Sequence, residues 1–139
     1  MTLSSRNGVS QAIPFFGVTD MEASLSFYLD GLGFKLQNKW MPEGKIRWCL
    51  LTIDKASVML QEYLPDWRPT DPLGTGVSIC FICDDAIAIY KSIIANGIPA
   101  QRPFVGNSMW VTSVTDPDGY KMFFESPTDA AEESEYTDQ

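Results

Sequence analysis

The sequence predicts an α+β protein built from two βαβββ units, because one series of cap, turn and strand signals occurs twice in the chain. Three pairs of polar or glycine residues recur at an offset of 64 positions: Asp20 and Asp84, Gly33 and Gly97, and Asp54 and Asp118. The apolar pairs Val18/Ile82, Phe34/Ile98 and Leu50/Val114 keep the same offset. A shared offset across different signals indicates two copies of one supersecondary unit. Two units that face each other form a cleft, where a binding site is expected.

The first unit is expected over residues 12–63. Residues 12–18 are rich in apolar and aromatic side chains, as in a buried strand. Thr19 or Asp20 then caps a helix with apolar residues at helical spacing, and Gly31 and Gly33 end it. Three further strands are expected at 34–40, 46–53 and 57–63.

The second unit is expected over residues 76–127, after a linker at 64–75 whose prolines and glycine fit neither a helix nor a strand. Its first strand covers 76–82, and Asp84 or Asp85 caps a helix that Asn96 and Gly97 end. The remaining strands are expected at 98–104, 110–115 and 120–125, with a turn at 116–119, Asp-Pro-Asp-Gly, before the last.

Both ends of the chain are polar. Residues 1–11 form an N-terminal polar segment, and 5 of the 18 acidic residues lie in 128–139. Without that C-terminal segment the net charge changes from −8 to −3, since 13 acidic residues then oppose 10 basic ones. We expect 128–139 to be a disordered, solubilising tail. Because the chain has no basic stripe, a nucleic-acid partner is not expected.

A cytoplasmic location is expected. No apolar run approaches the length of a membrane span, and residues 1–11 lack the apolar stretch of a signal peptide. The three cysteines, Cys49, Cys80 and Cys83, are an odd number and do not suggest a disulfide framework. Cys80 and Cys83 form a C-x-x-C pattern, but residues three apart in a strand point to opposite faces.

Three motifs in order carry a resemblance to a known family. They are VTDMEASLSFY at 18–28, LGF at 32–34 and DPDGY at 116–120. With this order, the chain resembles the vicinal oxygen chelate superfamily over about residues 12 to 127. That superfamily includes glyoxalase I, extradiol dioxygenases, and fosfomycin and bleomycin resistance proteins. The resemblance specifies the fold but not the reaction, since proteins with this one fold catalyse many different reactions.

The resemblance implies a divalent metal held by one residue from the first and last strand of each unit, typically histidine and glutamate. In this chain those positions fall on Ile13 or Pro14, Met59, Ser78 or Val77, and Phe123. None of these is a ligand for a hard or borderline cation, and the chain contains no histidine. We therefore expect no metal and no cofactor. The alternative is a weak Mg²⁺ or Mn²⁺ site of oxygen ligands from Glu125 with Gln61 or Glu62.

A cleft without metal is expected to bind an organic molecule. Met59 and Gln61 share one strand face, and Phe123 and Glu125 share another, which gives an apolar floor with polar ends. This resembles the bleomycin resistance branch, whose members bind a ligand without catalysis in aromatic grooves at a dimer interface. The candidate aromatic residues are Trp40, Trp48, Trp67, Trp110, Phe16 and Phe104. Core packing is expected for Phe16 and Phe104, whereas Trp110, after the loop 106–108, suits a partly solvent-exposed binding site.

The sequence therefore favours metal-free sequestration of a small, partly planar organic ligand by a homodimer, as in antibiotic resistance. The predicted ligand contacts are Met59, Gln61, Trp110, Phe123, Glu125 and Trp48. The first alternative is a lyase, isomerase or dioxygenase of the same superfamily, with an oxygen-ligand metal site or with Glu125 as a carboxylate base. The second is an accessory protein that presents the cleft edge to another protein. A triad hydrolase is excluded in its usual form by the absence of histidine.

Overall fold

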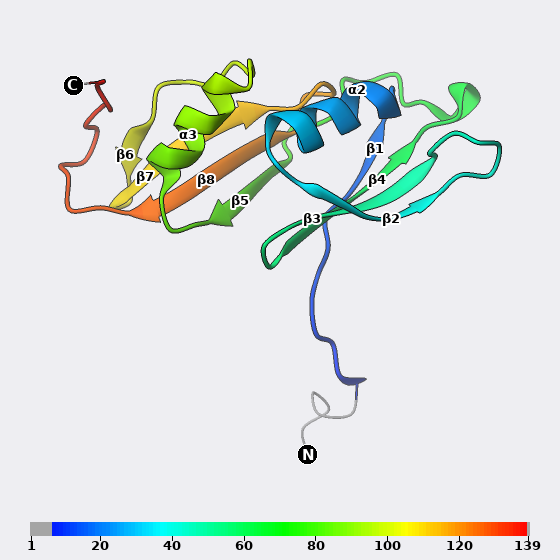
Figure 1. Ribbon diagram of the computed structural model, residues 1–139, viewed down its shortest axis with the longest axis horizontal. Helices are drawn as coiled ribbons and strands as arrows, with labels where there is room; N and C mark the ends of the chain where they lie inside the picture. Colours follow the sequence, from blue (N-terminus) through cyan, green and yellow to red (C-terminus); the bar gives the residue numbers. More distant parts are fainter. Residues whose placement is uncertain (1–6, 139) are drawn as a thin grey trace.

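The computed structural model describes residues 7–138 and contains two four-stranded mixed sheets, one from each half of the chain (Figure 1). The strand order of the first sheet is β1 (Phe15–Val18), β4 (Ala56–Glu62), β3 (Trp48–Ile53) and β2 (Lys35–Trp40). The order of the second is β5 (Ser78–Ile82), β8 (Lys121–Pro127), β7 (Met109–Thr115) and β6 (Phe104–Gly106). In each sheet the first strand runs parallel to the last, and the other pairs are antiparallel. The predicted α+β fold of two βαβββ units is confirmed.

One helical segment follows the first strand of each unit. Asp20 caps α2 (Met21–Leu25) by accepting a hydrogen bond from the Ala23 amide, and the segment continues as a π-helical stretch, η1 (Ser26–Gly31). Asp85 caps α3 (Ala86–Ala95) in the same way, through the Ala88 amide. Short polar side chains satisfy the free amides of a first helical turn, which explains why each helix begins where it does. Within residues 7–138, no helix is long and apolar enough to cross a membrane.

The two units share one hydrophobic core between the helices and the sheets. Alternate strand residues point into it, so that Val58 and Leu60 are fully buried on β4. The aromatic rings of Phe34 and Phe81, one from each unit, meet edge to face with centroids 6.0 Å apart. Phe81 then stacks on Phe124 at 5.0 Å. The core is thus continuous across the chain.

The Asp-Pro-Asp-Gly turn of the second unit is bonded to the first unit. The Asp118 carboxylate accepts hydrogen bonds from the Thr19 hydroxyl at 2.6 Å and the Thr19 amide at 3.1 Å. The Tyr28 hydroxyl donates to Asp116 at 2.8 Å, and the Tyr120 hydroxyl donates to the Gly17 carbonyl at 2.9 Å. These bonds hold the two sheets side by side, with α2 and α3 on the same side of them (Figure 1).

Strand β6 differs most from its prediction. A strand was expected at 98–104, but β6 covers only Phe104–Gly106 and pairs with Met109 to Val111. Pro99 and Pro103 lack the amide hydrogen that a ladder requires, and residues 98–103 therefore run past β7 without pairing. The other strand boundaries differ from the predicted ones by three residues or fewer.

The expectation of a disordered C-terminal tail is wrong for residues 128–138. Backbone hydrogen bonds join this segment to the outer edge of β6: Val105 donates to Ser134, Glu133 donates to Val105, and Tyr136 donates to Pro103. The acidic side chains find a basic partner in Arg102, which lies 3.7 Å from Glu135 and 3.9 Å from Asp138. Gln139 and residues 1–6 of the N-terminal polar segment lie outside the described residues.

Candidate functional site

Each sheet has one face covered by a helix and one open face. On the first sheet the open face, called face A, consists of Phe15, Trp40, Trp48, Leu50, Met59 and Gln61. Phe15 is 55% exposed and Trp40 is 53% exposed, although both side chains are large and apolar. An apolar patch of this kind on a sheet usually marks a surface that contacts a ligand or another protein.

Face A brings together three of the predicted ligand residues. Trp48 lies directly across the β3–β4 ladder from Gln61, and Met59 lies two positions before Gln61 on β4. Phe15 on β1 is the parallel neighbour of Met59. Sequence spacing predicted that Met59 and Gln61 share a face, because alternate residues of a strand point to the same side of the sheet.

The open face of the second sheet, called face B, holds two more predicted residues. It consists of Cys80, Val111, Ser113, Lys121, Phe123 and Glu125. Phe123 lies between Cys80 on β5 and Ser113 on β7, and Glu125 follows it on the same face. Burial, together with the Glu125 carboxylate, raises the pKa of the Cys80 thiol to about 11, so this thiol is protonated and a poor nucleophile at neutral pH.

The expectation that Trp110 lies beside Phe123 is wrong. Trp110 pairs with Ser126, which is buried on the helix side of the sheet, so Trp110 points away from face B. Its ring meets Tyr136 of the C-terminal segment edge to face at 6.2 Å. A shift of one residue in a strand exchanges the two faces, and no residue pattern in this segment indicated which face Trp110 would occupy.

The two open faces do not meet in one chain. Gln61 lines a pocket of about 500 Å³ with Phe15, Gly17 and Trp67, whereas Phe123 lines other pockets. In the part of the chain that the structure describes, none of the five main pockets is lined by both Met59 and Phe123, so these two predicted ligand contacts share no pocket among the five.

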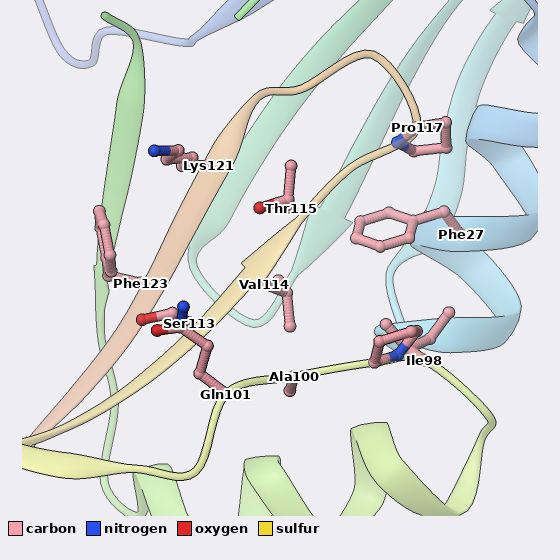
Figure 2. Close-up of a pocket in the computed structure, with 11 residues that line it drawn as sticks. Phe27, Ile98, Ala100, Gln101, Ser113, Val114, Thr115, Pro117, Lys121 and Phe123 are labelled. Carbon is pink, nitrogen blue, oxygen red and sulfur yellow. The ribbon is translucent and has the colours of Figure 1, made fainter.

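Face B borders two pockets that we call the trough. The larger, of about 610 Å³, lies where β6 does not continue, so that Ser113 to Thr115 of β7 pair with β8 on one side and have no strand on the other. Figure 2 shows Lys121 and Phe123 on one side of it and Phe27 and Ile98 on the other. A second pocket, of about 490 Å³, lies between the same two β8 residues and the chain from Leu73 to Ser78.

The sequence reasoning missed the polar residues of the trough. Lys121, Ser113, Thr115 and Gln101 all line its larger pocket. Lys121 could have been found, because it lies two positions before Phe123 on the same strand and therefore on the same face. Gln101 carried no signal, since it belongs to a segment that was expected to be a strand.

The residues at the family's metal positions do not fit a hard divalent cation. The β1 residue beside Met59 is Phe15, and the β5 residue beside Phe123 is Cys80. Each lies two residues after the first-strand position that the resemblance implied, Ile13 and Ser78. The side chains of Phe15, Met59, Cys80 and Phe123 include one thiol and no oxygen or nitrogen ligand. In the described part of the chain, no group of three or more histidine, cysteine or acidic residues is arranged so that it could hold a metal ion.

Glu62, an alternative metal ligand, is already bonded on the helix side of the first sheet. Its carboxylate accepts a hydrogen bond from the Met21 amide at 2.8 Å and forms ion pairs with Arg47 and, at 3.2 Å, with Lys45. Burial alone would raise the pKa of Glu62, but the Met21 amide and the two cations outweigh it and lower the pKa below its ordinary value. A site that combines Glu62 with Glu125 is therefore not formed.

Comparisons with known proteins agree with this geometry. The family model described as the glyoxalase/bleomycin resistance protein/dioxygenase superfamily matches residues 12–124. Among curated proteins, none matches the sequence.

Three solved structures illustrate the similarity of fold. TnmS3, an antibiotic binding protein from Streptomyces sp. CB03234, is 23% identical with a TM-score of 0.64, covering 86% of this chain and 98% of that one. A bleomycin resistance determinant encoded on the transposon Tn5 is 21% identical with a TM-score of 0.67, covering 88% and 100%. A bleomycin-binding protein complexed with bleomycin is 22% identical with a TM-score of 0.66, covering 85% and 98%. At these identities the similarity is one of fold.

Proposed function

Because the chain belongs to the glyoxalase/bleomycin resistance protein/dioxygenase superfamily, we propose that it binds a small, partly planar organic molecule and sequesters it without metal or catalysis. The observation that carries this proposal is the chemistry of the open faces. Met59 and Phe123, two of the positions at which the resemblance implies metal ligands, are apolar, and their neighbours on the first strands are Phe15 and Cys80. Apolar, aromatic walls with few polar groups suit a flat organic ligand.

The second part of the proposal is that two chains form a homodimer. The open faces of one chain lie side by side, so a cleft requires a second copy. If face A of one protomer lies opposite face B of its partner, a two-fold axis creates two equivalent clefts. Each cleft then combines Trp48, Met59 and Gln61 with Phe123 and Glu125. The exposed Phe15 and Trp40 favour such pairing, since a dimer removes their surface from water.

The proposed ligand class includes antibiotics, since one similar structure is named as an antibiotic binding protein and another as a bleomycin-binding protein. Sequestration of this kind protects a cell when the protein shares a compartment with the antibiotic's target. We place the protein in the cytoplasm, and its three free thiols, Cys49, Cys80 and Cys83, support that location.

A thermal-shift screen of planar drugs and metabolites tests the proposal, because a ligand that prefers the native state raises its stability. For a hit, calorimetry compares the wild type with Phe123→Ala. Removal of one aromatic anchor is expected to weaken binding by about 1 to 3 kcal/mol, or roughly 5-fold to 150-fold. Ile94→Ala, at an exposed position on α3, is the control and should leave the affinity unchanged. Equal affinity in a folded Phe123→Ala variant would place the site elsewhere.

A further inference from the structure

Lys121 occupies the centre of the trough. Its side chain lines both pockets of face B, and so does Phe123. Among the residues that the structure describes around these two pockets, Lys121 is the only one with a charge; the others are apolar, hydroxyl-bearing, amide or glycine residues. The trough therefore has a positive centre, although the whole chain has a net charge of −8.

The acidic groups nearest to Lys121 in sequence are engaged elsewhere. Asp116 accepts the hydroxyl of Tyr28, and Asp118 is bonded to Thr19. Glu125 lies on face B but four residues further along β8, which is about 13 Å at the usual strand rise. Within residues 7–138, the ion pairs within 4.0 Å involve Lys45, Arg47 and Arg102, and not Lys121. Its ammonium group is thus available to a ligand.

The surroundings of Lys121 fit a planar molecule with an acidic group. Phe123 offers a partly exposed ring two positions away on the same face, and Phe27 lines the opposite side of the larger pocket (Figure 2). Ser113 and Thr115 supply hydroxyl groups, and Gln101 supplies an amide, at the free edge of β7. An aromatic body can contact Phe123 while its charged oxygen reaches the ammonium.

We infer that the ligand of this protein is an organic anion, a planar aromatic body with a carboxylate, phenolate or sulfonate oxygen that pairs with Lys121. This inference rests on the proposed function, and it adds the charge of the ligand and the residue that selects it. A cationic ligand of the same shape is disfavoured, because it would bring two like charges together at the centre of the trough. Lys121 is a specificity residue in this assignment.

Three probes with one aromatic body test the inference: an anthracene carboxylate, the matching carboxamide and an aminomethyl anthracene. Binding is measured by fluorescence titration of the full chain. The wild type is expected to bind the carboxylate about fivefold more tightly than the carboxamide, and the ammonium compound more weakly still. The preference should fall as salt is raised, because ions screen a partly exposed charge pair.

Variants then assign the preference to one side chain. Lys121→Ala should bind carboxylate and carboxamide equally, Lys121→Glu should favour the ammonium compound, and Lys121→Arg should keep the wild-type preference. Lys39→Ala, which removes an exposed lysine from β2, is the matched control and should behave as the wild type does. Circular dichroism verifies that each variant is folded.

The two proposals fail in different ways. If the wild type binds all three probes with equal affinity, or if the preference survives in Lys121→Ala, the charge inference is overturned while the binding function stands. If no probe binds, or if Phe123→Ala leaves the binding of every probe unchanged, both the proposed site and the charge inference are overturned.

Discussion

Removal of the Tyr28 hydroxyl is predicted to destabilise the junction between the two units. Tyr28 is fully buried, and its hydroxyl donates a 2.8 Å hydrogen bond to Asp116 in the turn of the other unit. Asp116 also accepts the amides of Asp118 and Tyr120, each at 2.9 Å. The variant Tyr28→Phe keeps the ring in the core and deletes one of the three donors to a buried carboxylate.

The magnitude follows from the charge of the acceptor. A hydrogen bond to a charged group contributes about 1.5 to 3 kcal/mol, more than a bond between neutral groups. For a chain of 139 residues, an unfolding entropy of about 2.1 cal/mol/K per residue converts this loss into a fall in Tm of roughly 5 to 10 °C. Tyr90→Phe, on the partly exposed surface of α3, is the control and should change Tm by less than about 2 °C.

The pH dependence distinguishes this mechanism from a general packing defect. Burial raises the pKa of Asp116 above its ordinary value, although the Tyr28 hydroxyl and two amides oppose the rise. A raised folded pKa means that the contribution of Asp116 to stability is fully present below the unfolded pKa and is lost as pH rises through the folded pKa. The hydrogen bond from Tyr28 stabilises the ionised carboxylate of Asp116 more than the neutral carboxyl group.

The stability gap between the wild type and Tyr28→Phe should therefore narrow as pH falls from 7 toward about 4. Urea unfolding of both proteins across this range measures it. A gap that is constant with pH, or a variant as stable as Tyr90→Phe at pH 7, would refute the assigned role of the bond.

Three further predictions concern charge, metal and assembly. Glu62→Gln should lose about 1 to 3 kcal/mol of unfolding free energy at neutral pH. Because the pKa of Glu62 is lowered in the folded state, this contribution is fully present above the unfolded pKa and is lost as pH falls through the folded pKa, so the difference between the two proteins should shrink in acid; a difference in urea stability that does not shrink between pH 7 and the acid limit of folding would contradict this. Protein purified without chelator should contain well under one transition-metal ion per chain, whereas one zinc, nickel, iron or manganese ion retained through dialysis and found by elemental analysis would overturn the metal-free proposal. Light scattering at tens of micromolar protein should give about twice the 15.5 kDa of one chain, and a monomer mass would argue against the paired open faces.

The sequence allowed the fold to be predicted because its local signals are strong and agree with one another. Asp20 and Asp85 begin the helices as N-caps, and the burial of alternate residues follows the predicted strands. Repetition of the same order fixed the topology, since the signals of one unit supported those of the other. The resemblance to the superfamily, carried by three short motifs, is confirmed by the family model over residues 12–124.

The site was harder to predict, since it depends on long-range contacts. Strand parity decides whether Trp110 or its neighbour faces the ligand, and Trp110 is drawn to the helix side, where Tyr136 of the C-terminal segment contacts it. That segment was expected to be disordered from its charge, but backbone bonds to Val105 hold it in place. The charge of a segment indicates how well it is solvated. It does not show whether the folded protein has an unpaired strand edge to which the segment can bind.

The junction between the units gives the physical reason for proposing that a second chain completes the binding surface. Asp118 and Asp116 tie the last turn of the second unit to Thr19 and Tyr28 of the first, and these bonds place the sheets side by side. A junction with this geometry leaves face A and face B of one chain without a partner. Pairing of face A with face B of another copy would cover both surfaces and place Lys121 beside aromatic walls from two chains. Lower local dielectric would then strengthen its pairing with an anion, so dimer formation and anion selectivity should rise together with protein concentration.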